Sequence, residues 1–219
     1  MSGLFQYPPK AEFGRVVPKV KIYEHAGANT ALKDMFITQV EQINWTHKLS
    51  PETTNLPATK AVAEIQVFAV ALKTAELDER VLRSMDEAIA SPIIFELAHK
   101  SKHKMMAAFK EPTISGWTVS DYFAGPWLAQ STKRLPLPVA LDLGQLYAGL
   151  LATLMPVSKR ANEDISTAVA RVEQIKALEK QLSRARQDLR REKQFNRQVE
   201  INASLRKLER ELGMLKSDE

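Results

Sequence analysis

Two glutamates and a lysine are the residues of this sequence that could together catalyse a hydrolytic reaction. Glu64, Glu96 and Lys110 lie in three separate apolar runs, each typical of a buried strand. Metal-dependent nucleases of the restriction type hold a divalent cation and its water with carboxylates on neighbouring strands and a nearby lysine. Their acidic–x–lysine spacing is missing, because Gln66 stands two residues after Glu64 and lacks the charge. A nuclease that uses these three residues is therefore an alternative interpretation.

Other catalytic and metal-binding patterns are missing from the sequence. No two histidines with a glutamate between them are spaced by four residues on a predicted helix, as in a zinc hydrolase. Cysteine is absent, which excludes disulfides and thiolate metal sites. The serines form no G-x-S-x-G turn, and there is no glycine-rich phosphate loop. The sequence therefore predicts no metal and no cofactor, and it favours a non-enzymatic role.

Basic residues are concentrated near the C-terminus. The net charge is +5, and residues 159–219 contain fifteen Lys/Arg against eleven Asp/Glu, so this part holds +4 of it. Six cations, opposed locally by Asp188 and Glu192 alone, could contact the phosphates of a nucleic acid or steer the chain toward an acidic partner. They are Arg184, Arg186, Arg190, Arg191, Lys193 and Arg197. The simpler interpretation is a solvated helix face with some intrahelical ion pairs.

Leucine and isoleucine recur in the same region at the three- and four-residue spacing of a coiled coil. The predicted partner-binding seam consists of Ile175, Leu178, Leu182, Leu189, Ile201, Leu205, Leu208 and Leu212. Between Leu189 and Ile201 the spacing is twelve residues, which breaks the heptad. Either one helix of about 50 residues continues through a local change in winding, or the chain folds back near residues 194–196 as a hairpin. The sequence slightly favours the continuous helix.

The first 157 residues are expected to form an α+β domain that precedes this helical arm, residues 163–217. A small mixed or antiparallel sheet with helices packed on one face is predicted from the order of the elements. We expect strands over residues 19–23, 64–72, 93–97, 105–110 and 117–123, and helices over 29–45, 78–89 and 142–154. Residues 156–162, which begin with a proline, separate the two parts.

Composition is typical of a folded protein outside the membrane. Hydrophobic residues make up 44% of the chain and charged residues 26%. There is no run of about 18 apolar residues and no basic start followed by an apolar segment, so neither a membrane span nor a signal peptide is expected. The expected location is the cytoplasm.

Several short segments together resemble an uncharacterised bacterial family of domains of unknown function. The resemblance covers nearly the whole chain and is carried by residues 11–15, 21–24, 48–53, 64–68, 92–97 and 193–197. Members of this family are encoded beside superfamily-two helicases and DNA methyltransferases in restriction-like phage-defence clusters. The resemblance therefore implies a biological setting, and it assigns no catalytic residue.

These observations predict a non-enzymatic accessory subunit of a bacterial anti-phage defence or restriction-like, DNA-targeting complex. Its expected partner is a helicase or methyltransferase subunit of that complex, bound through the coiled coil. Self-association through the arm and direct contact with DNA are further expectations. Two alternatives remain: the nuclease already described, and a stand-alone nucleic-acid-binding module.

Overall fold

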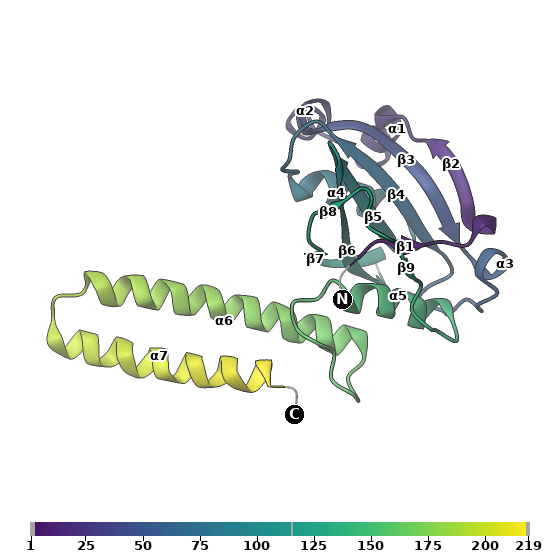
Figure 1. The fold of residues 1–219 in the computed structure, drawn as a ribbon. Coiled ribbons are helices and arrows are strands. Elements are labelled where there is room, and N and C mark those ends of the chain that lie inside the picture. The colour runs from purple at the N-terminus through teal and green to yellow at the C-terminus, as the bar shows by residue number, and fades with distance from the viewer. Residues whose placement is uncertain (1–2, 115, 218–219) are drawn as a thin grey trace. The chain divides into compact units, whose positions relative to one another are not determined.

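The computed structural model of the chain describes residues 3–114 and 116–217. These residues form two units, one within residues 1–155 and the other within residues 156–219 (Figure 1). The first unit contains a mixed sheet with helices, and the second contains two helices.

A mixed sheet forms the centre of the first unit. Its neighbouring strands pair antiparallel except β4 and β5, which are parallel and are joined through helix α4 (Glu79–Ala88). The strands, in spatial order, are β2 (Glu12–Val16), β3 (Val40–Leu49), β4 (Ile65–Leu72), β5 (Ile93–His99), β6 (Lys102–Thr113) and β7 (Gly116–Ala124). β8 (Leu128–Ala129) pairs with β6, and β1 (Phe5–Gln6) pairs separately with β9 (Leu135–Pro136). The predicted α+β class is confirmed.

One face of the sheet packs against α1 (Lys19–His25), α2 (Thr30–Gln39) and α4. Phe68 and Phe95 from the sheet lie in one buried cluster with Phe36 of α2 and Leu82 of α4. The side chain of Asp78 accepts a hydrogen bond from the backbone N–H of Arg80 and so caps α4.

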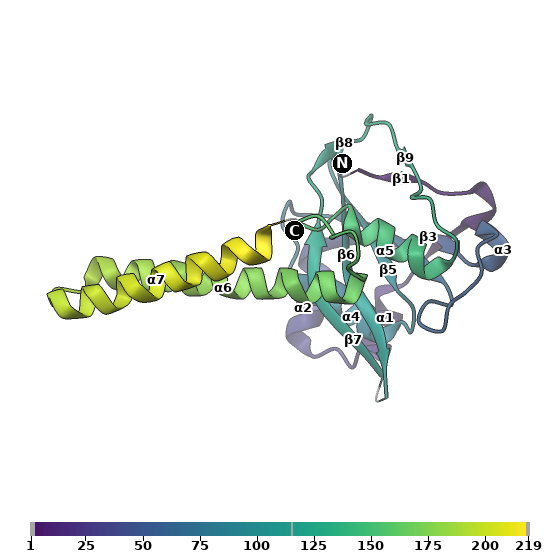
Figure 2. The same ribbon diagram turned by 90° about the horizontal axis from the view of Figure 1, so that it is seen from below.

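The opposite face is covered by α5 (Leu143–Ala152), as Figure 2 shows. Tyr147 of this helix stacks on Phe109 of β6, and its hydroxyl donates to the carbonyl of Ala108 at 2.6 Å. Because side chains alternate along a strand, Phe109 points away from the face to which its neighbour Ala108 contributes. The expectation of helices on one face is therefore wrong, since β4, which is largely buried along its length, needs cover on both.

Two local predictions in the N-terminal part are also wrong. The segment predicted as a strand over residues 19–23 is helix α1, which begins directly after Pro18, a residue that suits a helix start. The helix predicted to reach Trp45 ends at Gln39, because Val40–Leu49 pairs with β4 as a strand. Tertiary pairing here overrides a helical spacing that continues for one more turn. Two short helices, η1 (Pro9–Ala11) and α3 (Pro51–Thr54), complete the unit.

The second unit is a helical hairpin, not the slightly favoured continuous helix. α6 (Ile165–Arg191) and α7 (Phe195–Lys216) flank a turn at residues 192–194 and lie side by side (Figure 1). Glu192 forms this turn, because its carboxylate accepts the backbone N–H groups of Lys193 at 2.7 Å and Gln194 at 2.9 Å. The twelve-residue gap between the two leucine runs is the position of the reversal, and the reversal lets each run face the other.

Candidate interaction surface

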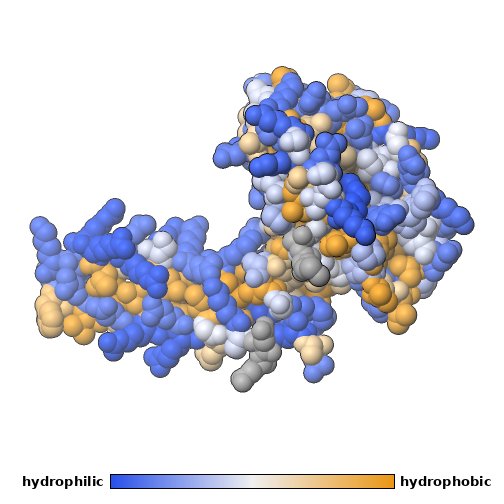
Figure 3. Space-filling model, viewed as in Figure 1, coloured by the Kyte–Doolittle hydropathy of each residue, from blue (hydrophilic) through white to orange (hydrophobic). Residues whose placement is uncertain are grey.

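The predicted seam residues lie between the two helices of the hairpin. Ile175, Leu182 and Leu205 are buried there, so each is covered by the chain itself. The other five remain half-buried: Leu178, Leu189, Ile201, Leu208 and Leu212. A band of hydrophobic residues is visible along the hairpin between rows of hydrophilic side chains (Figure 3). Two helices therefore cover part of the apolar stripe, and the rest faces outward.

A buried arginine holds the open end of the hairpin together. The Arg171 guanidinium, 5% exposed, donates to both carboxylate oxygens of Glu163 at 2.8 Å. It also donates to the carbonyl of Leu215 in the last turn of α7 at 3.0 Å, where a cation suits the helix dipole. Arg160 donates to the carbonyls of Met214 and Ser217, both at 2.9 Å. These contacts fix the α7 C-terminus against the start of α6, and no sequence pattern indicated them.

The same arginine controls the ionisation of its partner. Hydrogen bonding from Arg171 lowers the pKa of Glu163 to about 2. The carboxylate is consequently ionised throughout the neutral and mildly acidic range, which keeps the pair intact.

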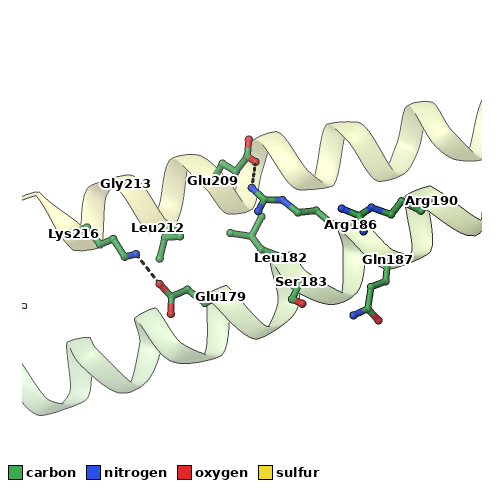
Figure 4. Close-up of a pocket in the computed structure, with 10 residues that line it drawn as sticks. All are labelled: Glu179, Leu182, Ser183, Arg186, Gln187, Arg190, Glu209, Leu212, Gly213 and Lys216. Carbon is green, nitrogen blue, oxygen red and sulfur yellow. Dashed lines mark hydrogen bonds and ion pairs between the residues drawn. The ribbon is translucent and has the colours of Figure 1, made fainter. Parts of the chain in front are cut away.

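One side of the hairpin is a groove crossed by ion pairs (Figure 4). Arg186 of α6 lies 2.9 Å from Glu209 of α7, and Lys216 lies 2.6 Å from Glu179. Lys216 follows Glu209 along α7, whereas Glu179 precedes Arg186 along α6. The two helices therefore run antiparallel. These pairs are half-exposed, so their role is chiefly to set the register of the helices.

The other side of the seam carries an apolar groove. Ala177 and Leu178 of α6 and Met214 and Leu215 of α7 supply its apolar lining, with Gln174, Gln181 and Glu211 at its edges. Met214 is 65% exposed, and Leu178 and Leu215 are half-buried. Leu178 belongs to the predicted seam, whereas Met214 falls outside the heptad positions and could not be predicted from them.

The six predicted nucleic-acid-binding cations are all exposed. Arg186 pairs with Glu209, and Arg197 lies 3.9 Å from Glu200. Arg184, Arg190, Arg191 and Lys193 have no ion-pair partner among residues 3–114 and 116–217. These cations therefore lie on the half of the hairpin that contains the turn at residues 192–194, called its distal half below.

The three residues of the nuclease interpretation are bound separately. Glu64 forms an ion pair with Lys48 at 2.6 Å and accepts a hydrogen bond from the amide of Gln66 at 2.6 Å. Glu96, which is buried, is held by both terminal nitrogens of Arg134 at 2.7 and 2.8 Å. Glu96 follows Phe95 in β5 and so points to the sheet face opposite the Phe95 cluster.

Lys110 lies on the Phe95 side and is buried against α4. Its ammonium group donates to the carbonyls of Asp86 and Ile89 near the C-terminus of that helix. Burial lowers the pKa of Lys110 and raises the pKa of Asp86 to about 6, while the Tyr122 hydroxyl donates to the Asp86 carboxylate. Glu96 and Lys110 therefore face opposite sides of the sheet and do not form one site with Glu64.

Two further polar side chains of the first unit, Tyr7 and His47, lie near enough to Glu96 for its charge to act on their pKa values. The Tyr7 ring packs on His47 with 4.6 Å between centroids. The Tyr7 hydroxyl and the His47 Nδ1 are buried and have no hydrogen-bond partner within the described ranges. Burial, and secondarily the charge of Glu96, raises the pKa of Tyr7, whereas burial lowers the pKa of His47. No sequence pattern indicated this pair.

Neither a metal cluster nor a membrane helix is found in the part of the chain that the structure describes. Within it, no group of three or more His, Cys, Asp or Glu side chains is placed to hold a metal ion. None of its helices combines the length and the hydropathy that a membrane crossing requires.

The sequence of the chain matches a known protein family. A family model described as a domain of unknown function, DUF4391, matches residues 5–212. The chain belongs to this family. The match extends from β1 into α7, so the hairpin is part of the DUF4391 domain. Neither the curated proteins nor the solved structures contain a match to the chain. The resemblance to a family of domains of unknown function is confirmed, whereas the setting beside helicases and methyltransferases stays a prediction.

Proposed function

We propose that this DUF4391 chain is a non-enzymatic accessory subunit of a bacterial anti-phage defence or restriction-like, DNA-targeting complex. In this proposal the hairpin binds a helix of the helicase or methyltransferase subunit encoded beside it. The DNA-targeting setting is supported by the family resemblance, and the mode of docking is supported by the hairpin surface.

The open apolar groove of the hairpin is the observation that carries the proposal. Ala177 and Met214 are exposed in this groove, and Leu178 and Leu215 beside them are only half-buried by the hairpin itself. An amphipathic helix of a partner would bury them by the same side-chain packing that joins α6 to α7. A large apolar side chain that goes from exposed to fully buried contributes about 1.5–3 kcal/mol. Met214 can gain much of this on docking, and the half-buried Leu178 and Leu215 can gain part of it.

The charged groups of the first unit do not offer a comparable surface. Glu96 and Lys110 are buried and held by other groups of the protein, and Glu64 is paired with Lys48. An interaction through the hairpin therefore agrees better with the distribution of exposed groups than catalysis on the sheet does.

Co-purification tests this proposal directly. The tagged full-length chain is co-expressed with the adjacent helicase and methyltransferase subunits, and the captured proteins are quantified. Leu178→Glu combined with Met214→Glu places two charges in the groove, and we expect capture to fall at least tenfold. Val139→Glu is the matched control, because Val139 is fully exposed in the first unit. Capture that is unchanged in the groove variant, while its circular dichroism remains helical, would refute docking through this groove.

A further inference from the structure

Phe195 is the exposed aromatic residue at the distal end of the hairpin. Its side chain is 76% exposed although it begins α7, and Val199, one turn later, is 52% exposed. Neither takes part in the seam between α6 and α7. The exposed phenyl ring is therefore available to a ligand that stacks on it, and covering it would remove apolar surface from water.

The turn before Phe195 fixes where the ring is presented. The Glu192 carboxylate accepts the two backbone N–H groups of the turn, and the Gln198 side chain donates to the Glu192 carbonyl at 2.8 Å. The ring therefore projects from a bonded turn, and the carboxylate of Glu192 is occupied by the backbone.

Helical spacing places Phe195 on the same side of α7 as the ion-pair groove. Phe195 and Val199 lie fourteen residues before Glu209 and Gly213, which line that groove, and this separation is close to four helical turns. Arg206 shares this side of the helix, three residues before Glu209. Arg190 of α6 extends into the groove (Figure 4).

The charge on this side is positive. Arg190 and Arg206 have no ion-pair partner among the residues that the structure describes. The acids of the same groove, Glu179 and Glu209, are already paired with Lys216 and Arg186. A separate groove on the other side is lined by three acids and two arginines, namely Asp188, Glu192, Glu200, Arg191 and Arg197, so it lacks this excess of positive charge.

We propose that the distal end of the hairpin binds single-stranded DNA, with one base stacked on Phe195 and phosphates held by Arg190, Arg206 and Lys193. An exposed ring beside unpaired cations is the combination that single-stranded nucleic acids require, because each unpaired base presents a flat face beside a charged phosphate. A duplex hides those faces, and an acidic peptide supplies the charge without a ring to stack. The choice of DNA over RNA rests on the proposed DNA-targeting function.

Fluorescence anisotropy with a labelled 20-nucleotide oligothymidylate tests the stacking contact on the full chain alone. Phe195→Ala is expected to weaken binding roughly tenfold, the typical effect of losing one base–aromatic stack, whereas Phe195→Trp retains it. Leu141→Ala is the control, because Leu141 is equally exposed at 76% and lies in the first unit. An unchanged affinity for Phe195→Ala would overturn the proposal.

The salt dependence of binding separates stacking from charge. Arg190→Gln should reduce the slope of log affinity against log salt by about 0.7, the value for one phosphate contact on a single strand. Phe195→Ala should leave that slope unchanged. Equal affinity for a 20-base-pair duplex, tighter binding of oligouridylate, or competition by polyglutamate at equal charge would each contradict the assignment. Because no partner protein is present, failure here leaves the docking experiment unaffected, and the reverse also holds.

Discussion

The buried charged residues of the first unit are bound by other groups of the protein, whereas the cations on the distal half of the hairpin are exposed to solvent. Glu96 is held by Arg134, and Lys110 is held by carbonyls at the end of α4. Arg184, Arg190 and Arg191 face solvent. A charge whose partners lie inside its own unit stabilises the fold, and an exposed charge is available to a ligand. The hairpin therefore offers more charge to a ligand than the groups that hold the sheet unit together.

Each unit contains a buried carboxyl group, and the pKa values of the two groups are shifted in opposite directions. Desolvation raises the pKa of Asp86 to about 6, because burial of this α4 side chain outweighs the hydrogen bond from Tyr122 and the nearby charges of Lys110 and Arg83. The Arg171 guanidinium lowers the pKa of Glu163 to about 2. Desolvation thus favours the neutral acid at Asp86, and the bidentate hydrogen bonds of Arg171 favour the anion at Glu163.

Loss of the buried arginine in the hairpin should have the largest effect. Arg171→Met leaves Glu163 without its cation and the last turn of α7 without a donor, so we expect the hairpin to lose about 3 kcal/mol of stability. Hydrogen exchange of the α6 and α7 amides measures this. Lys180→Met, an exposed cation change on the same helix, should alter stability by less than about 0.5 kcal/mol. Equal effects of the two substitutions would show that Arg171 does not hold the hairpin.

A buried lysine in the first unit should matter for folding and not for DNA cleavage. Lys110→Met removes the donor to the Asp86 and Ile89 carbonyls, and we expect about 2 kcal/mol of destabilisation in denaturant unfolding. Lys102→Met is the control, since Lys102 is an exposed lysine of the same strand. Magnesium-dependent cleavage of plasmid DNA by the wild-type chain, abolished by Glu64→Ala, would restore the nuclease interpretation.

The contrast between the two carboxyl groups predicts opposite pH dependences. The folded-state pKa of Asp86 lies above its unfolded value of 3.8, so the native state favours the protonated acid and stability falls as pH rises from about 4 to about 6. Glu163 contributes stability above its unfolded pKa of 4.5, and this contribution is lost as pH falls toward about 2. Denaturant unfolding between pH 3 and pH 7 should therefore show a flatter profile for Asp86→Asn than for the wild type. Parallel profiles would contradict the raised pKa.

The exposed ion pairs of the hairpin should have the smallest effect. A double-mutant cycle on Arg186 and Glu209, with alanine at each, should give a coupling free energy of about 0.2–1 kcal/mol that decreases with salt. A coupling well above that range would mean that this groove is less open to solvent than its half-exposed side chains indicate.

Much of the fold could be predicted from local patterns. The runs at 64–72, 93–97 and 117–123 are strands, and the helix that begins after Asp142 has the predicted cap, because these segments agree in propensity and in burial. Residues 40–45 were predicted to continue a helix, and this was wrong, since the apolar spacing that suits a helix belongs here to Val40–Leu49, which pairs with β4 as a strand. The reversal near Gln194 was one of two interpretations, and a heptad break alone does not decide between a stutter and a turn.

The candidate surface was less predictable than the fold. The seam and the cations were visible in sequence, but Met214 and Phe195 stand out only once their exposure is known. Arg171 and Glu163 are eight residues apart and meet because Glu163 precedes the capped start of α6. The sequence placed Glu64, Glu96 and Lys110 in neighbouring strands, but it did not show which face of the sheet each side chain takes. They could therefore be grouped as one site although they do not form one.

Hydrogen exchange of the chain mixed with the helicase or methyltransferase subunit that we propose as its partner tests the central claim most directly. If the hairpin is the docking surface, amides of α6 around Leu178 and of α7 around Met214 should gain protection when the partner binds, while those of β4 and β5 stay unchanged. Protection confined to the sheet unit, with the hairpin exchanging as it does in the free chain, would contradict the account.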